Sequence, residues 1–163
     1  MDIQMAYCDS PLGLIEISAT EKGIRSVGFV EAQASFESSD NKHLSKCKKE
    51  LEEYFNGERR NFTVSLDWKG TDFQKSVWDI LMEIPYSKTI SYMDIAKRLD
   101  NLKAIRAVGS ANGRNKIAII VPCHRVIGSD GQLTGYAAGL PRKEWLLKHE
   151  GNPAFSQNQM TLF

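Results

Sequence analysis

Residues 119–126 read Ile-Ile-Val-Pro-Cys-His-Arg-Val, and the rest of the chain is organised around this stretch. The β-branched run predicts a strand, and Pro122 restricts the backbone directly before Cys123. A thiolate attacks far better than a thiol, and a neighbouring imidazole or guanidinium lowers the pKa of a cysteine. We therefore expect Cys123, followed by His124 and Arg125, to be a nucleophile. The alternative is a buried structural cysteine.

The 163-residue chain has a charge asymmetry that its net charge of +1 conceals. Residues 1–68 hold 8 Lys and Arg against 12 Asp and Glu, whereas residues 69–163 hold 13 against 8. Between positions 97 and 125 there is one acid, Asp100, and a basic patch of Lys97, Arg98, Lys103, Arg106, Arg114, Lys116 and Arg125. Such a patch is typical of proteins that bind phosphate backbones, and an ordinary solvated face is the alternative of equal weight.

The number and spacing of the cysteines and the hydropathy of the chain predict the cellular compartment of the protein. Cys8, Cys47 and Cys123 are odd in number and show no metal-ligand spacing, so neither a disulfide framework nor a zinc site is supported. The chain lacks a basic start followed by an apolar run, and no apolar run is long enough to span a bilayer. We expect a monomer in a reducing cytoplasm, without membrane contact.

The first 68 residues predict a small antiparallel sheet and one helix. Apolar residues alternate over 14–18 and 24–29, and turn sequences at 10–13 and 21–23 separate these runs into a meander. Apolar residues then recur at helical spacing at Leu44, Cys47, Leu51, Tyr54 and Phe55. Alternation over 62–66 predicts one more strand, and the charge shift near Trp68 marks a boundary between subdomains.

The second subdomain, residues 69–151, is predicted to be mainly helical. The capping box Thr71-x-x-Gln74 opens a helix that must end near Pro85. A short helix capped by Ser91, a turn at 100–102 and a second helix over 103–112 form a predicted helix-turn-helix. Small residues keep the second helix slim enough to enter a groove, although they would equally suit packing against a core helix.

The predicted strand over 117–121 leads into the cysteine. A glycine-rich loop over 128–139 follows, and a last helix begins at Pro141 and ends at Glu150-Gly151. Residues 152–163 form a polar tail with an apolar tip. The predicted fold class is α+β, with an antiparallel sheet first and a helical region second.

With these elements in place, the sequence resembles the O6-alkylguanine-DNA alkyltransferase family. The most specific part of the resemblance is Val121-Pro122-Cys123-His124-Arg125-Val126, which is similar to the family's active-site signature. Supporting motifs are Ser91-Tyr92, Arg106-Ala107-Val108-Gly109, Asn112-Gly113-Arg114-Asn115, Gly135-Tyr136 and the run over 143–151. The first subdomain resembles the family's ribonuclease H-like domain in pattern only.

The resemblance implies direct-reversal DNA repair, in which an alkyl group passes from O6 of guanine to a cysteine that is not regenerated. O4 of thymine is a further candidate donor. Cys123 would be the nucleophile, His124 would take its proton through a water, and Glu150 would orient that histidine. Tyr92 would donate a proton to guanine N3. Neither a metal nor a cofactor is implied.

The resemblance also implies how DNA is held. Arg106 would fill the gap that the flipped base leaves in the duplex. Asn115 would brace the active-site turn and, with Val126, Tyr136 and Ala137, form the guanine pocket. The further DNA-contacting residues are Ser91, Lys103, Ser110, Arg114 and Arg125.

Three other functions compete with this interpretation. A lesion binder that flips the base without reacting would lack the cysteine, so Cys123 argues against it. A DNA-binding regulator would use only the helix-turn-helix. A cysteine hydrolase would use Cys123 and His124 but would turn over, whereas an alkyltransferase is consumed.

The tail supplies a separate prediction. Its last residues, Gln159-Met160-Thr161-Leu162-Phe163, resemble short peptides by which bacterial repair and replication proteins bind the sliding clamp. Gln159 would offer its amide, and Met160, Leu162 and Phe163 would fill an apolar pocket. The alternatives are that the tail folds back on its own domain or has no role.

Overall fold

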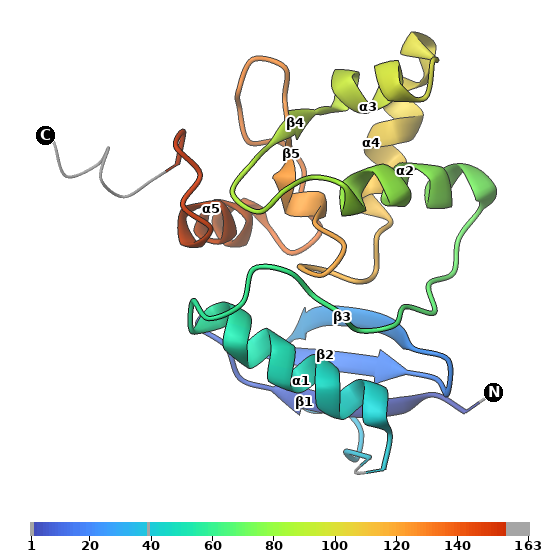
Figure 1. Cartoon of the computed structure of the whole chain (residues 1–163), viewed down its shortest axis with the longest axis vertical. Coiled ribbons are helices and arrows are strands. Elements are labelled where there is room, and N and C mark those ends of the chain that lie inside the picture. Colours follow the sequence, from blue (N-terminus) through green and yellow to red (C-terminus); the bar gives the residue numbers. More distant parts are fainter. Residues whose placement is uncertain (1, 39, 156–163) are drawn as a thin grey trace, which may run out of the picture. The chain divides into compact units, whose positions relative to one another are not determined.

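The computed structural model describes residues 2–38 and 40–155, and it confirms the predicted α+β class. The described chain divides into two compact units (Figure 1). The first contains the chain up to Lys69 together with Lys116–Ile120. The second contains Gly70–Asn115 and the chain from Val121 onward.

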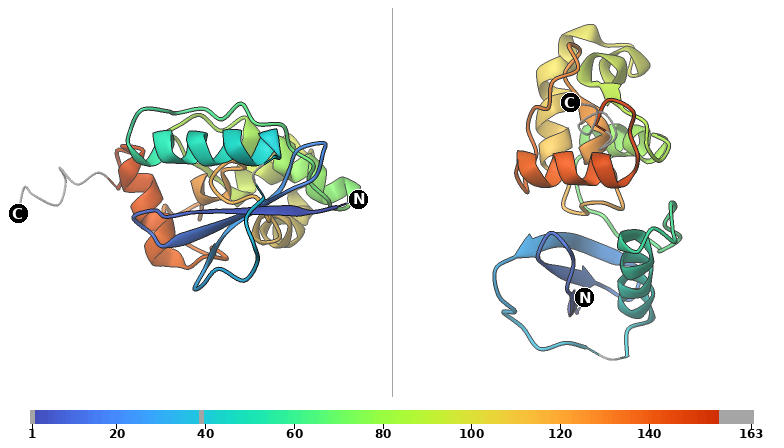
Figure 2. Two further views of the ribbon diagram at one scale, coloured as in Figure 1. Left: turned by 90° about the horizontal axis from the view of Figure 1, so that it is seen from below. Right: turned by 90° about the vertical axis from the view of Figure 1, so that its left-hand side faces the viewer.

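The first unit is an antiparallel sheet covered by one helix. Strands β1 (Gln4–Cys8), β2 (Leu14–Ala19) and β3 (Ile24–Val30) pair in the order β1-β2-β3, which confirms the predicted meander. The alternating apolar residues of β2 point into the core, where they are fully buried. Helix α1 (Lys42–Phe55) runs across one face of the sheet (Figure 2), and the Asn41 side chain caps its first turn.

Two predicted strands are single bridges instead. Over 62–66 only Leu66 pairs, with Ile24, and over 117–121 only Ile117 pairs, with Val27. After that bridge the chain turns, and Ile119 adopts a left-handed φ of 72°. The β-branched composition was misleading because the segment must leave the sheet at once to reach the turn that holds Cys123.

The second unit is mainly helical, as predicted. Helix α2 (Asp72–Met82) begins with the predicted Thr71–Gln74 capping box. Helix α3 (Tyr92–Arg98), the 3-10 turn η1 (Leu102–Ala104) and helix α4 (Ile105–Gly113) form the helix-turn-helix. The remaining elements are β4 (Ile90–Ser91), η2 (Cys123–Arg125), β5 (Val126–Ile127) and α5 (Leu140–His149).

Packing within this unit places α4 and the cysteine turn. The Trp78 indole on α2 donates to the Ala111 carbonyl of α4 at 2.8 Å, which fixes the last turn of α4. Strand β5 pairs in parallel with β4, so the chain after η2 lies beside the start of α3. The start of α3 and the residues that follow the cysteine turn therefore lie side by side.

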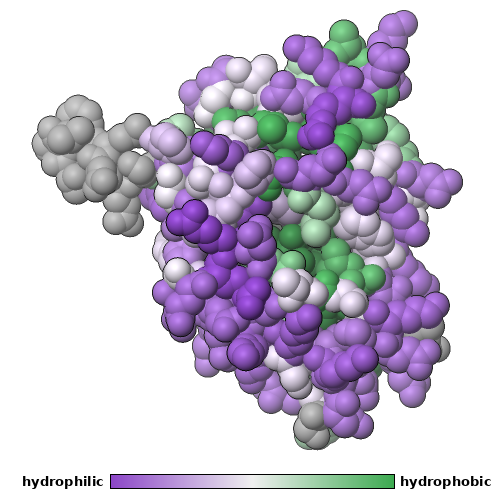
Figure 3. Space-filling view, in the orientation of Figure 1, coloured by the Kyte–Doolittle hydropathy of each residue, from purple (hydrophilic) through white to green (hydrophobic). Residues whose placement is uncertain are grey.

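Polar side chains cover most of the face shown in Figure 3, and apolar ones gather in smaller patches. Within the described ranges, none of the helices has both the length and the apolar character needed to cross a membrane.

Ser87, in the loop after α2, has a left-handed φ of 70°. The Ser87 N–H points to Glu150 Oε1 at 3.4 Å, and its carbonyl accepts from Asn152 Nδ2 at 2.9 Å. These two contacts hold a conformation that a residue with a Cβ atom adopts only at a cost.

We expect Ser87→Gly to raise the free energy of unfolding by about 0.5 kcal/mol. Glycine removes the backbone strain in the folded state, and this gain exceeds the loss from the greater entropy of the unfolded chain. Ser76→Gly, within helix α2, is the matched control and should lower it by a similar amount. Urea unfolding measures both. A loss of stability in Ser87→Gly equal to that of the control would show that Ser87 is not strained.

Candidate active site

A tight turn presents Cys123 to a pocket. The Cys123 N–H donates to the Val121 carbonyl at 2.8 Å, and the Arg125 N–H donates to the Pro122 carbonyl at 3.0 Å. These bonds close the turn η2, whose first residue is Cys123. The Cys123 side chain is 6% exposed and lines a pocket of about 390 Å³.

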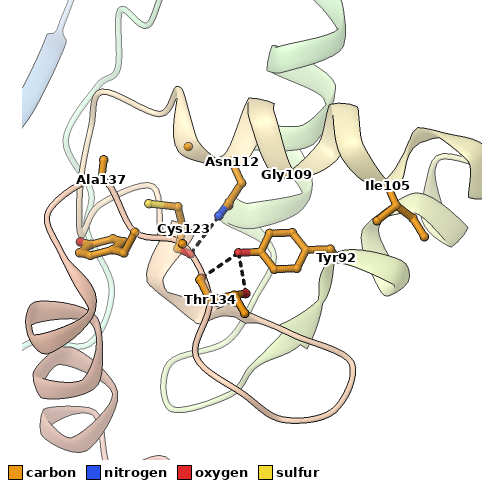
Figure 4. A pocket seen from close by; sticks show the side chains of 10 residues that line it. Tyr92, Ile105, Gly109, Asn112, Cys123, Thr134 and Ala137 are labelled. Atoms are coloured by element: carbon orange, nitrogen blue, oxygen red, sulfur yellow. Dashed lines mark hydrogen bonds between the residues drawn. The ribbon is translucent and has the colours of Figure 1, made fainter.

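The pocket is enclosed by helices α3 and α4, the cysteine turn and the loop before α5. Figure 4 shows the Tyr92 ring reaching from α3 toward Thr134, with Cys123 and Asn112 close by. Its lining residues are Tyr92, Ile105, Gly109, Asn112, Gly113, Cys123, Thr134, Gly135, Tyr136 and Ala137. Of the predicted pocket residues, Tyr136 and Ala137 line it.

Asn115 and Val126 have other positions. The Asn115 side chain donates to the Val121 carbonyl at 2.8 Å and hydrogen-bonds to the Cys123 thiol, and it is not among the residues that line the pocket. Val126 is fully buried in β5, where it pairs with Ile90. Its side chain belongs to the core and does not line the pocket.

The Cys123 thiol is held mainly in its protonated form. Burial raises its pKa, and the hydrogen bond from Asn115 and the charge of Lys143 offset that rise only in part. The expected lowering by the imidazole and guanidinium next in sequence is wrong, because both of those side chains point away to Glu150. The free protein therefore carries little thiolate.

His124 and Glu150 form a fully buried pair behind the cysteine. The His124 Nε2 atom lies 2.8 Å from Glu150 Oε2. Burial by itself would raise the pKa of Glu150, but hydrogen bonds and charge from His124 and Arg125 outweigh it and keep the pKa well below its usual range. Burial lowers the pKa of His124. A neutral imidazole that donates Nε2–H to a carboxylate leaves Nδ1 as a proton acceptor.

Arg125, which was predicted to contact DNA, is only 7% exposed, and its guanidinium is engaged inside the unit. Its Nε and Nη2 donate to the two oxygens of Glu150 at 2.8 and 3.0 Å, and Nη1 donates to the Ile84 carbonyl at 2.8 Å. The guanidinium also lies over the Tyr86 ring. Arg125 therefore fixes Glu150, which in turn orients His124.

The structure adds Lys143, which the sequence analysis missed. Lys143 is fully buried in α5, and its ammonium donates to the carbonyls of Thr134 (2.7 Å) and Gly135 (3.2 Å). Burial lowers its pKa to about 8. Its place on the apolar face of Leu146 and Leu147, three and four residues on, is the signal that would have found it.

The same Thr134 carbonyl accepts from the Tyr92 hydroxyl at 3.1 Å. Tyr92 and Lys143 thus both hold the loop before α5. The Tyr136 hydroxyl is buried. Burial is the main reason that the pKa of Tyr136 lies well above its ordinary value, and the nearby Cys123 raises it further.

The remaining predicted DNA contacts lie on the helix-turn-helix. Lys103, Arg106, Ser110 and Arg114 are exposed along η1, α4 and its C-terminal end. The Ser91 hydroxyl caps α3 by accepting from the Asp94 N–H at 3.0 Å. An exposed basic helix therefore lies on the same unit as the cysteine pocket.

Fold and site together define a class: a DNA-binding protein in which a helix-turn-helix adjoins a cysteine nucleophile supported by a buried histidine–glutamate pair. Two family models match the chain. Residues 72–152 match the DNA-binding domain of 6-O-methylguanine DNA methyltransferase, and residues 3–68 match the ribonuclease-like domain of the same family.

Individual relatives agree with these matches. The methylated-DNA–protein-cysteine methyltransferase of Methanosarcina acetivorans is 50% identical over 152 residues, which cover 90% of this chain and 97% of that protein. The Mycobacterium tuberculosis counterpart is 44% identical over 161 residues, 95% of each chain.

Solved structures give the same result. The M. tuberculosis O6-methylguanine methyltransferase is 42% identical with a TM-score of 0.81, covering 91% of this chain and 93% of that one. M. tuberculosis OGT in complex with DNA is equally similar and covers 96% and 97%. This chain belongs to the 6-O-methylguanine DNA methyltransferase family.

We expect Arg125→Leu to lower the free energy of unfolding by about 3–5 kcal/mol, because it leaves the Glu150 charge buried without its main counterion. Arg114→Leu, at an exposed arginine, is the matched control and should change it by about 0.5 kcal/mol or less. Urea unfolding compares the two. Similar small effects in both variants would mean that Arg125 does not stabilise the site.

Proposed function

We propose that this chain repairs DNA by direct reversal, transferring an alkyl group, methyl in the simplest case, from O6 of guanine in duplex DNA to Cys123 Sγ. The observation that carries the proposal is the buried His124–Glu150 pair, 2.8 Å apart, whose histidine directly follows a cysteine that lines a pocket. A thioether is chemically inert to the side chains present, so each protein molecule reacts once.

The protons and electrons balance within this site. The His124 Nδ1 atom takes the thiol proton through a water, and Sγ attacks the alkyl carbon while the carbon–O6 bond breaks. The bonding pair goes to O6, and Tyr92 donates a proton to the departing guanine at N3. The imidazolium of His124 then releases its proton through water to the Tyr92 phenolate, so that in sum the thiol proton ends on guanine. The Tyr92 hydroxyl must therefore give up its hydrogen bond to the Thr134 carbonyl in order to bond to guanine N3.

The DNA-binding role is assigned to the helix-turn-helix. Arg106 fills the space of the flipped nucleotide, and the exposed residues Lys103, Ser110 and Arg114, with Ser91, contact the backbone. Residues 69–151 then form the DNA-binding and alkyltransferase domain, residues 1–68 the N-terminal subdomain and residues 152–163 a tail. The guanine pocket is closed by Tyr136 and Ala137, with Asn115 bracing the turn.

Two further assignments belong to this proposal. The free thiols Cys8, Cys47 and Cys123 suit a reducing cytoplasm. Contact with a sliding clamp stays a prediction, because its residues, Gln159, Met160, Leu162 and Phe163, lie outside the described part of the chain.

The test is intact-protein mass after incubation with a duplex containing O6-methylguanine. We expect each protein molecule to gain one methyl group, located on the peptide that contains Cys123, and Cys123→Ser to gain none. Cys123→Ser should still bind DNA, because binding is chiefly to phosphates. Repair with an unmodified protein would indicate a hydrolase, and no adduct at all would refute the proposal.

We expect Arg106→Ala to slow transfer from duplex DNA by at least tenfold and to leave reaction with the free base O6-methylguanine within about twofold. The reason is that its role concerns only the flipped state, and unstacking a base costs a few kcal/mol. Lys103→Ala is the control. It should weaken DNA affinity and its salt dependence, without the difference between duplex and free-base rates that is expected for Arg106→Ala. Single-turnover rates measure both reactions. Equal slowing of both substrates by Arg106→Ala would contradict the role of Arg106 in the flipped state.

A further inference from the structure

Helix α1 of the first unit carries exposed lysines that the proposed function does not use. Lys42, Lys46 and Lys49 are all exposed. Their spacing of four and three residues places them next to one another on one side of the helix. The other side of α1 packs on the sheet (Figure 2), where its apolar residues are buried. We call these three residues the α1 lysine stripe.

The ammonium groups of the stripe have no carboxylate partner within the described part of the chain. Lys46 Nζ donates a hydrogen bond to the Thr63 carbonyl at 3.2 Å, which leaves its charge in place. Glu53 follows on the same side of the helix one turn later, but its carboxylate accepts from Arg59 Nε at 2.9 Å. The positive charge of the stripe is therefore not neutralised by its own unit.

The order of charges along α1 opposes the helix dipole. The N-terminal end of a helix favours acidic side chains, and the C-terminal end favours basic ones. In α1 the first turn holds no acid and the last turn holds no base. Residues 42–49 contain four lysines and no acid, whereas residues 50–53 contain three glutamates. The stripe therefore does not serve the stability of the helix, and a local preference broken in this way points to a role outside the unit.

The chemistry of the surface favours a nucleic acid over a protein as the partner. Protein interfaces have an apolar centre that is depleted in lysine. Every residue of α1 is described, and none of its large apolar side chains is exposed. A phosphate backbone, in contrast, is bound by lysine and arginine without apolar contact. Lysine also suits phosphates at varying positions, because it is a point charge on a flexible stem.

The length of the stripe fits a phosphate backbone. From its first to its last lysine it extends roughly 10 Å along the helix axis, at 1.5 Å per residue. Phosphates of one DNA strand follow one another at about 3.4 Å along the duplex axis, so the stripe matches about three of them. Residues 1–68 are acidic overall, with 8 Lys and Arg against 12 Asp and Glu. Any attraction of this unit to DNA must therefore be local, and the stripe is its local source.

We propose that the α1 lysine stripe binds the phosphate backbone of duplex DNA. The contact is additional to that of the helix-turn-helix, and it extends the DNA binding of the proposed function from the second unit to the first. It is electrostatic and independent of base sequence, so it adds affinity without adding specificity for the lesion.

The first test asks whether DNA covers the stripe. The full chain is treated with an amine-acetylating reagent, with and without a long unmodified duplex, and mass spectrometry measures acetylation at each lysine. We expect the duplex to slow acetylation of the stripe about fivefold or more, because a lysine held at a phosphate is shielded. Lys22, in the turn between β2 and β3, and Lys48, which pairs with Glu37, are the controls and should react at unchanged rates. A stripe that reacts equally fast on DNA would overturn the inference.

The second test measures how salt weakens binding to the same duplex. The variant Lys42→Gln/Lys49→Gln is compared with Lys22→Gln/Lys48→Gln, which removes the same charge from the same unit. Each lost phosphate contact lowers the slope of log affinity against log salt concentration by about 0.9, so we expect a decrease of about 1.8 for the stripe variant. The control should change the slope by about 0.5 or less. Equal changes would show that only net charge matters, and the inference would fail.

Transfer from the free base O6-methylguanine checks that both double variants are intact, and it should be unchanged because the stripe is not part of the pocket. If a double variant has lost this activity, it is not correctly folded, and acetylation of the wild type decides alone.

Two outcomes separate the inference from the proposed function. If the stripe variant keeps the wild-type slope and loses only cooperativity between protein molecules on the duplex, the stripe contacts a second copy of this chain. The inference is then wrong, and the proposed function stands. If the wild type shows no salt-dependent binding to the duplex at all, the DNA-binding part of the proposed function fails together with the inference.

Discussion

The site depends on one buried carboxylate. Glu150 ends helix α5 and receives hydrogen bonds from His124, from Arg125 and from the Ser87 backbone. A buried charge is stable only when it is surrounded in this way, so three separate segments must converge on it. That convergence fixes the turn that carries Cys123, and through it the pocket in front. Losing Arg125 leaves this charge inside the unit without its counterion.

The same arrangement controls when the thiol reacts. Burial raises the pKa of Cys123 and lowers the pKa of His124, and the bond of His124 Nε2 to Glu150 leaves Nδ1 as the proton acceptor. A thiol of this kind is a poor target for stray electrophiles, because the thiolate is the reactive form. The imidazole of His124, next in sequence, supplies a proton acceptor. A protein that uses its nucleophile once benefits from keeping that sulfur protonated until a base occupies the pocket.

The loop before α5 is held by two side chains from different elements. Its Thr134 carbonyl is shared by the buried Lys143 ammonium and the Tyr92 hydroxyl. The lysine is buried inside the unit, whereas the tyrosine lines the pocket. The loop is therefore held both from the core and from the pocket.

The sequence by itself determined the elements whose causes are local. Alternation gave the meander, capping boxes at Thr71 and Ser91 gave the helix starts, and the residues around Cys123 marked the nucleophile. What it misjudged depends on contacts between distant segments. The run over 117–121 has strand composition but only one bridge, because the chain must turn to place the cysteine. Arg125 was read as a DNA contact from its charge, and only folding brings Glu150 to it from 25 residues away. Composition records what a side chain is able to do, and tertiary structure decides which partner is within reach.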